Sequence, residues 1–146
     1  MTDDAALGWV EAPDEPEVRE LLLSVARSAR SGDGALALAS VDGELVGFGY
    51  WRRYERPTHR PHADLEKLAV DPSVHRTGVG RRLTERLIDA ARQAGIEQLT
   101  LDLRADNVSA LRLYESVGFR EYGRLADFVA VNDRRLGKVF MVRDLR

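Results

Sequence analysis

The sequence contains no cysteine, only two lysines and no long apolar run. The absence of cysteine excludes disulfide bonds, a thiolate nucleophile, an acyl-cysteine intermediate and a cysteine zinc site. The most apolar stretch, residues 36–41, is interrupted by Ser40 and falls far short of the ~18 residues that a membrane span requires. The first residues are acidic, unlike a signal or transit peptide, so we expect a cytoplasmic protein that does not contact a membrane.

The remaining composition is that of a globular protein. Its 146 residues are 44% apolar and 32% charged, which predicts a single domain spanning residues 1–146. The net charge of -2 disfavours nucleic acid as a partner, because proteins that bind duplexes are usually basic. All the basic residues except Lys67 and Lys138 are arginines, and five arginines gather between residues 76 and 92.

Hydrophobic periodicity and turn residues predict an alternation of helices and strands. We expect helices at 14–30, 78–94 and 107–117, strands at 7–12, 35–41, 45–51, 63–70, 98–104, 119–131 and 138–145, and a loop over 52–61. The strand-helix-strand segment within 63–103 requires a parallel crossover, whereas the turns at Asp42-Gly43 and Asn132-Asp133 indicate antiparallel hairpins. The expected fold is α/β (α+β), with a mixed, mostly antiparallel sheet, a central parallel β-α-β crossover and helices on both faces.

Two glycines at spacing two, Gly78 and Gly80, lie where the 78–94 helix is expected to begin. Glycine lets backbone N–H groups converge on an anion, and a helix N-terminus adds a partial positive charge. The guanidinium groups of Arg76, Arg81 and Arg82 can add charge-assisted hydrogen bonds. The pattern therefore indicates either a pyrophosphate-binding loop or a plain glycine turn before an arginine-rich, solvated helix.

Two other phosphate-binding motifs fit this loop less well. A Walker loop requires Lys and then Ser or Thr after its last glycine, but Arg81 and Arg82 follow Gly80. A dinucleotide-binding fingerprint requires glycine or alanine where this chain has Leu83, and a first glycine directly after the strand. A dinucleotide-dependent oxidoreductase is therefore a weak alternative.

The chain resembles the GNAT superfamily of acyl-CoA-dependent N-acetyltransferases through two motifs, which occur in the family's order. The first motif is Leu68-Ala69-Val70-Asp71-Pro72, followed by His75-Arg76-Thr77-Gly78-Val79-Gly80. The second matches Asn-x-x-Ala-x-x-Leu-Tyr-x-x-x-Gly-Phe at Asn107, Ala110, Leu113, Tyr114, Gly118 and Phe119. The resemblance covers about residues 44–145, and its departure is His75, which stands where the family has Gln or Arg.

The resemblance implies a GNAT-like fold and acetyl-CoA as co-substrate. The amides of residues 76–81 would bind the pyrophosphate, and the backbone of Leu68 and Val70 would pair with the pantetheine arm. The Val70 amide would polarise the thioester carbonyl, and Tyr114 would protonate the departing thiolate, unless its ring serves only in the core. Asn107 would contact the cofactor arm, cap the helix that follows it, or do both. The expected acetyl-CoA-binding residues are thus Leu68, Ala69, Val70, His75, Arg76, Thr77, Gly78, Val79, Gly80, Arg81, Asn107 and Tyr114.

Asp64 and Glu66 are the candidate general bases. An amine with a Lys-like pKa of ~10.4 must lose a proton before it attacks a thioester, and a carboxylate can accept that proton. The two residues alternate on the strand that would carry the cofactor and so share a face, with Lys67 expected on the opposite face. Glu66 is nearer to Val70, whereas a carboxylate at the position of Asp64 matches some family members. Either residue can instead be a solvated strand charge.

His59 and His62 lie before the cofactor strand, in a stretch that also holds Arg52, Arg53, Arg56 and Arg60. A third ligand for a metal ion is missing nearby, so we expect no metal site. A solvated loop is favoured over contacts with a substrate carboxylate or with the 3′-phosphate of CoA.

Together, these patterns predict an N-acetyltransferase that moves acetyl from acetyl-CoA to a primary amine. Because no cysteine is present, we expect direct transfer in a ternary complex. We expect the acceptor amine to belong to a small molecule or to a peptide N-terminus, and the sequence does not choose between them. The alternative function is a non-catalytic acyl-CoA-binding or sensing module on the same fold. Dimers are common among similar proteins, so a homodimer is a candidate assembly.

Overall fold

The computed structural model describes residues 15–146, which form one six-stranded sheet with three α-helices. The helices are α1 (Glu15–Arg30), α2 (Val79–Gln93) and α3 (Val108–Ser116). The strands are β1 (Gly34–Val41), β2 (Glu44–Tyr54), β3 (His62–Val70), β4 (Gln98–Arg104), β5 (Arg120–Val131) and β6 (Arg134–Asp144). The strand expected at 7–12 lies outside the described residues.

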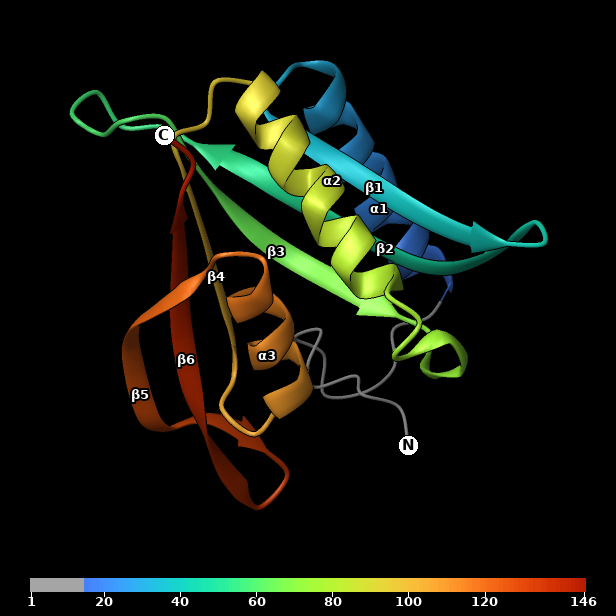
Figure 1. The fold of residues 1–146 in the computed structure, drawn as a ribbon, viewed down its shortest axis with the longest axis vertical. Helices are drawn as coiled ribbons and strands as arrows, with labels where there is room; N and C mark the ends of the chain where they lie inside the picture. The colour runs from blue at the N-terminus through green and yellow to red at the C-terminus, as the bar shows by residue number, and fades with distance from the viewer. Residues whose placement is uncertain (1–14) are drawn as a thin grey trace.

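The strands follow the order β1-β2-β3-β4-β6-β5 across the sheet (Figure 1). Every neighbouring pair is antiparallel except β3 and β4, which are joined through α2 and run parallel. The predicted mixed sheet with a central parallel crossover is therefore confirmed. No helix within residues 15–146 is both long and apolar enough to cross a bilayer.

Helices cover both faces of the sheet, as two adjacent residues of β2 show. The Trp51 indole donates a hydrogen bond to the Leu87 carbonyl of α2 at 2.9 Å. The next residue, Arg52, reaches the Ser24 hydroxyl of α1 at 3.2 Å. Because consecutive side chains of a strand point to opposite faces, α1 and α2 lie on opposite sides of β2.

The core forms mainly beneath α2. This helix buries Leu83, Leu87, Ile88 and Ala91, whose spacing of three and four residues forms one apolar face. Trp51, Leu65, Leu99, Leu101 and Met141 of the sheet are buried in the same cluster.

Close approach between α1 and the sheet depends on Gly34, the first residue of β1. A Cβ at this position would lie 3.0 Å from the Trp51 carbonyl oxygen and 3.1 Å from the Ser28 Cβ. We expect Gly34→Val to lower the free energy of unfolding by about 1–3 kcal/mol, the usual cost of overpacking, measured by urea denaturation. Gly123→Val is the matched control, because no atom lies within 4 Å of its Cβ position. Equal stability of the two variants would contradict the prediction.

The central feature of the sheet is that β3 and β4 separate soon after they meet. Residues 62–64 of β3 pair with residues 98–100 of β4. Beyond this point β3 continues beside β2 as far as Val70, while β4 continues beside β6 as far as Arg104. Figure 1 shows the two strands diverging, with α2 over one and α3 over the other. We call this opening the β3–β4 split.

Two local expectations are wrong. The loop predicted over 52–61 begins later, because β2 runs to Tyr54 and pairs Arg52 with Asp64 and Tyr54 with His62. The last strand begins at Arg134, not at residue 138, because β5 and β6 close directly around the Asn132-Asp133 turn. Both errors concern polar residues that alternation with apolar ones does not assign to strands.

Lys67 also departs from its prediction. Tyr50 pairs with Lys67 and Trp51 with Leu65, so Glu66 is an extra residue in β3. Such a bulge interrupts the alternation of faces. Burial lowers the pKa of the Lys67 ammonium, on which the charges of Glu66, Asp102 and Lys138 also act. Lys67 therefore lies on the face of the candidate bases, not on the opposite one.

Candidate active site

The glycine loop forms an anion cradle at the start of α2. Arg76 and Gly78 both have positive φ, at 66° and 88°. The first intrahelical bond of α2 runs from the Arg82 amide to the Gly78 carbonyl at 3.0 Å, and no side chain caps the helix. The amides of residues 78–81 are thus the four donors that any helix leaves unsatisfied at its N-terminus. These groups suit a pyrophosphate, as the resemblance implies.

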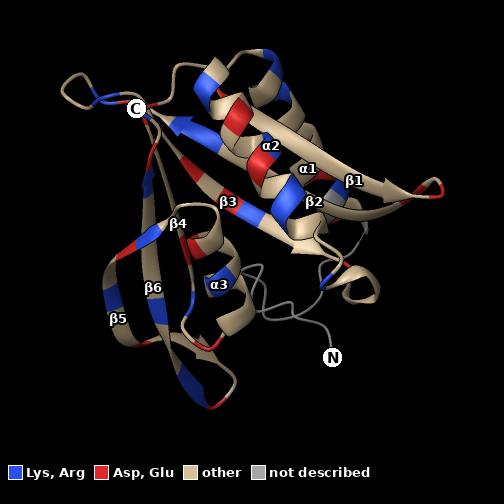
Figure 2. Ribbon diagram, in the orientation of Figure 1, with Lys and Arg blue, Asp and Glu red and all other residues tan. Residues whose placement is uncertain are grey.

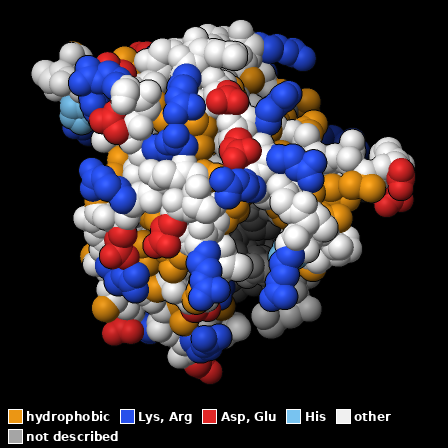
Figure 3. All heavy atoms as spheres, in the orientation of Figure 1, with side chains coloured by type: hydrophobic (Ala, Val, Ile, Leu, Met, Phe, Trp, Pro, Cys, Tyr) orange, Lys and Arg blue, Asp and Glu red, His pale blue; other side chains and the backbone are white. Residues whose placement is uncertain are grey.

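The arginines beside the loop are arranged differently from one another. The Arg82 guanidinium folds back onto the loop and donates to the Thr77 carbonyl at 3.2 Å. The Arg81 guanidinium turns away, toward Glu85 at 3.0 Å and the Ser116 hydroxyl at 3.2 Å. Figure 3 shows a hollow in this face, between the start of α2 and α3, with Lys and Arg side chains around its rim.

The end of β3 directs backbone amides into the split. The Asp71 amide donates to the Val46 carbonyl of β2 at 2.8 Å. Successive N–H groups of an extended strand alternate in direction, so the amides of Val70 and Leu68 point away from β2 and toward β4. On the side that faces β4, no strand within residues 15–146 pairs with β3 beyond Asp64. An extended ligand in the split could therefore pair with Leu68 and Val70 as a strand does.

His75 connects the loop to the end of β3. Its Nε2 lies 2.9 Å from the Val70 carbonyl oxygen, so with a proton on Nε2 the ring donates a hydrogen bond there. The imidazole thus ties the anion cradle to the residue whose amide is expected to polarise the thioester. His75 is among the residues expected around acetyl-CoA, but its contact with Val70 depends on the loop conformation and is not visible in the sequence.

We expect His75→Ala to weaken acetyl-CoA binding by about two- to ten-fold, the value of one ordinary hydrogen bond. His75→Gln should retain most of the affinity, because its amide can donate to the same carbonyl. Titration calorimetry measures both variants, and steady-state kinetics should show the loss in KM more than in kcat. A Gln variant as weak as the Ala variant would show that the hydrogen bond does not matter.

Tyr114 on α3 and Asn107, the residue before this helix, lie on the other side of the split. Tyr114 is 7% exposed, and its ring meets Phe119 edge-on with centroids 5.8 Å apart. Burial raises the pKa of its hydroxyl, which keeps the proton on the oxygen. Asn107 caps α3, because its Oδ1 accepts from the Ala110 amide at 3.2 Å. The capping role of Asn107 is confirmed, while contacts of both residues with the cofactor stay predictions.

The candidate bases lie at the narrow end of the split, on the face away from α2. Asp64 belongs to the last pair that joins β3 to β4, and it accepts a hydrogen bond from the Thr100 hydroxyl at 2.7 Å. Burial raises the pKa of Asp64 from 3.8 to about 6. Glu66 accepts from the Tyr54 hydroxyl and lies 3.6 Å from the Arg52 Nε. Asp64 is thus the less engaged carboxylate of the two.

Comparison with known proteins identifies the family of this site. The model of the acetyltransferase (GNAT) family matches residues 3–119. This chain belongs to the GNAT family. It is 40% identical over 79 residues to [Ribosomal protein bS18]-alanine N-acetyltransferase of Escherichia coli (strain K12), covering 54% of this chain and 53% of that protein. The chain thus spans about half the length of this curated relative.

Solved structures of GNAT proteins share the fold. Ribosomal-protein-alanine N-acetyltransferase from Brucella melitensis superposes with a TM-score of 0.77 at 27% identity, over 91% of this chain and 80% of that one. Phosphinothricin acetyltransferase from Sinorhizobium meliloti, solved in complex with acetyl-CoA, gives 0.78 at 19% identity, over 90% and 70% of the two chains. The second likeness concerns the fold alone.

Sequence reasoning missed several residues that this GNAT site gathers around its carboxylates. Burial, with the charge of Glu66, raises the pKa of Tyr50 to about 12, and the hydrogen bond to Glu66 raises the pKa of Tyr54 to about 12. Asp102 holds the Lys138 ammonium at 3.0 Å on the same face. Tyr50 and Tyr54 share the parity of Arg52 along β2, but without the bulge position the sequence does not show which face meets the acids.

The loop histidines lie at the far end of β3 from Val70. His59, Arg60, His62 and Gln98 line a pocket of about 260 Å³ there. Arg60 pairs with Asp144 at 3.1 Å, and Arg53 donates to the Ala94 carbonyl at 2.7 Å. Within the described part of the chain no group of three or more His, Asp or Glu side chains could hold a metal ion. The histidines and arginines of this region thus connect the ends of neighbouring elements and lie away from the split.

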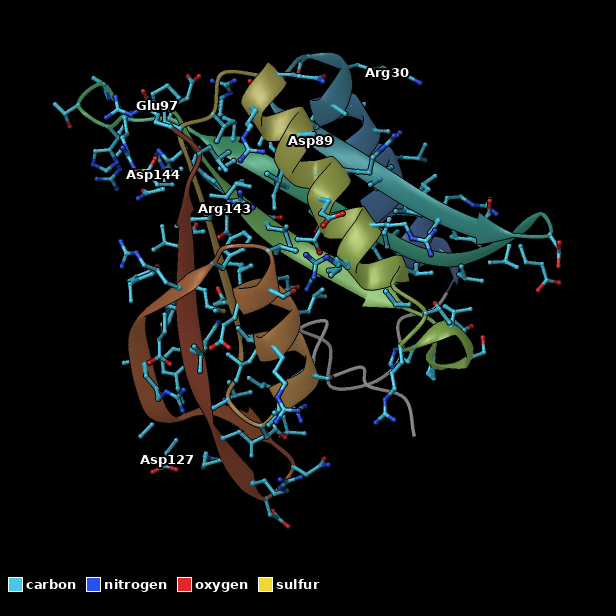
Figure 4. The ribbon with its side chains drawn as sticks, in the orientation of Figure 1. Arg30, Asp89, Glu97, Asp127, Arg143 and Asp144 are labelled. Atoms are coloured by element: carbon cyan, nitrogen blue, oxygen red, sulfur yellow. The ribbon has the colours of Figure 1, made fainter. Side chains whose placement is uncertain are left out.

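A second groove, of about 410 Å³, runs along α2 toward the end of α3. Figure 4 labels Asp89 on α2 and Arg143 on β6, which both line it. Arg143 donates to the Val117 carbonyl and covers Gly118, where a Cβ would lie 3.1 Å from the Arg143 Nε. Arg81 also lines this groove, so its side chain borders α3 rather than the amides of the anion cradle.

Proposed function

We propose that this GNAT protein moves acetyl from acetyl-CoA to a primary amine by direct transfer in a ternary complex. The observation that carries the proposal is the β3–β4 split with an uncapped, glycine-started helix at its wide end. A pyrophosphate at the amides of residues 78–81 would leave the pantetheine arm to extend along the Leu68 and Val70 amides. The thioester would then lie between β3 and α3.

We propose Asp64 as the general base, for which its position at the narrow end of the split and its few partners give support. With a pKa of about 6, Asp64 is mostly ionised at neutral pH and can take a proton from the acceptor ammonium, directly or through water. The Val70 amide would stabilise the oxyanion, and Tyr114 would give its proton to the CoA thiolate. Glu66 would hold Arg52 and the two tyrosines in place.

The titration of Asp64 gives a test that does not require activity. Because its folded pKa lies above its unfolded value, the native state binds more protons between pH 4 and 6, so Asp64 lowers stability as pH rises through this window. We expect Asp64→Asn to be more stable than the wild type at pH 7 by roughly 1–3 kcal/mol, since one pKa unit corresponds to ~1.4 kcal/mol. The difference should vanish near pH 4. Urea denaturation at several pH values measures it, and a pH-independent difference would contradict the assignment.

The acceptor is proposed as a class, the primary amines of small molecules or of peptide N-termini. Release of CoA can be followed with a thiol reagent, and the chain adds no thiol of its own. Amines, amino acids and short peptides should be screened with acetyl-CoA in this way. A protein that binds no acetyl-CoA by calorimetry and releases no CoA with any acceptor would overturn the proposal.

We also propose, from the sequence, that residues 1–146 form a single domain. We propose that the protein is located in the cytoplasm and can form a homodimer. Sedimentation velocity tests the assembly. A monomer at all concentrations would remove the homodimer and leave the site unchanged.

A further inference from the structure

The two lysines of this chain lie on the same face of the sheet, beside the split. Lys67 is on β3, directly before Leu68, and Lys138 is on β6. Charge interactions couple Lys67 to Lys138 and to Asp102 of β4, across the opening. The other basic residues of the 22 are arginines. Both primary side-chain amines of the chain therefore lie on the face of the candidate bases Asp64 and Glu66.

The environment of Lys67 suits an amine that must lose its proton. Its side chain is half-buried, and burial lowers the pKa of its ammonium. Glu66 on β3 and Asp102 on β4 are the carboxylates that act on it, and Lys138 on β6 is the cation that acts on it. Figure 2 shows the acidic and then the basic band of β3 before its arrowhead.

Lys67 is also close in the chain to the expected position of the thioester. The amide of the next residue, Leu68, points into the split, as derived from the Asp71 contact with Val46. The bulge at Glu66 turns Lys67 to the face of Asp64 and Glu66, where it pairs with Tyr50 of β2. A lysine side chain here starts one residue from the backbone that would pair with the pantetheine arm.

We propose that Lys67 is a self-acetylation site, at which the acetyl group of bound acetyl-CoA is transferred to Nζ of the same chain. The inference rests on the proposed acetyl transfer. The ammonium first gives one proton to a neighbouring carboxylate, and the neutral amine attacks the thioester carbon. A C–N bond forms, the C–S bond breaks, and the CoA thiolate takes a proton from Tyr114, the acid of the proposed transfer, to leave as the free thiol. The second amine proton passes to solvent, and Lys67 ends as a neutral acetamide.

Lys138 is the matched control that the chain supplies. Its ammonium lies 3.0 Å from the Asp102 carboxylate and near the rings of Phe128 and Phe140, at 5.7 and 5.8 Å from their centroids. It starts from β6, which pairs with β4 and β5 and not with the cofactor strand. Chemical acetylation in solution also favours the lysine with the lower ammonium pKa, so a preference for Lys67 counts as transfer from bound acetyl-CoA only where desulfo-CoA suppresses it.

The test incubates the full chain with acetyl-CoA and no acceptor, and measures the occupancy of each lysine by peptide mass spectrometry. We expect Lys67 to be acetylated at least about ten-fold faster than Lys138, because proximity favours the bound thioester. Desulfo-CoA should suppress the reaction, and urea should remove the preference. Lys67→Arg should abolish the modification, while Lys138→Arg should leave Lys67 reactive. The rate per chain should not depend on protein concentration.

The outcomes distinguish a failure of self-acetylation from a failure of the proposed acetyl transfer. Equal labelling of both lysines, or a rate that rises with protein concentration, would overturn transfer within one chain. CoA release with external amines but no acetyl group on Lys67 would overturn the inference and leave the proposed function intact. If the protein neither binds acetyl-CoA nor releases CoA with any amine, both the self-acetylation and the proposed function are overturned.

Discussion

Replacement of Tyr114 by Phe is expected to lower the turnover of acetyl transfer by about 10²- to 10⁴-fold, the usual contribution of a positioned acid. The affinity for acetyl-CoA should change by less than about two-fold, since the ring and its packing stay in place. The pKa of Tyr114 is raised by burial, so the wild-type hydroxyl keeps its proton throughout the neutral range. Single-turnover kinetics with a responsive amine, beside calorimetry with acetyl-CoA, measure the two effects separately.

Two other results would change the interpretation of Tyr114. Equal losses of turnover and affinity would assign the residue to packing, with its 5.8 Å edge contact to Phe119 as the reason. Unchanged CoA binding with no turnover in either protein would favour the non-catalytic acyl-CoA-binding module. A thermal denaturation curve for each variant separates these cases from simple unfolding.

Gly78→Val is expected to weaken acetyl-CoA binding by about 10- to 100-fold. The residue has φ of 88°, a conformation that costs a β-branched side chain about 1–3 kcal/mol. The nearest atom to its Cβ position, Arg82 Nη2, is 3.9 Å away, so the substitution changes the backbone preference more than the packing. A loop that relaxes from this conformation no longer aims the amides of residues 78–81 at one anion.

Two control variants make the result for Gly78 specific. Gly78→Asn should bind nearly as well as the wild type, because Asn tolerates positive φ. Gly43→Val places the same strain in the β1–β2 turn, where φ is 83°, and should lower stability without lowering affinity. Calorimetry on the three variants decides the matter. If Gly43→Val lost affinity for acetyl-CoA as Gly78→Val does, general destabilisation would explain the effect.

The elements with a regular apolar pattern could be predicted from the sequence. Leu99, Leu101 and Leu103 alternate, and β4 has the predicted bounds of 98–104. The Asp42-Gly43 turn was predicted as a hairpin, and both residues have the positive φ that such a turn requires. The two motifs also placed the glycine loop before α2 and Asn107 at the start of α3.

Features that depend on pairing between distant strands could not be predicted. The bulge at Glu66 is set by the register of β2 against β3, and it reverses the expected face of Lys67. The proposal of Asp64 over Glu66 rests on the partners of each carboxylate, which come from β2 and β4. The His75 contact with Val70 arises from a loop conformation with positive φ at Arg76, a backbone state that the sequence does not indicate for a non-glycine residue.

Within residues 15–146, the β3–β4 split also leaves the two halves of the sheet joined at only one short ladder. Strands β1 to β3 and strands β4 to β6 are two half-sheets, joined by the short ladder between residues 62–64 and 98–100. A ligand that pairs with β3 and rests against α3 acts as a temporary strand between the halves. Binding would then stiffen the joint as well as fill the site, and by linkage it would raise the resistance of the fold to unfolding. The bound co-substrate would thus contribute to the stability of the sheet as well as to the reaction.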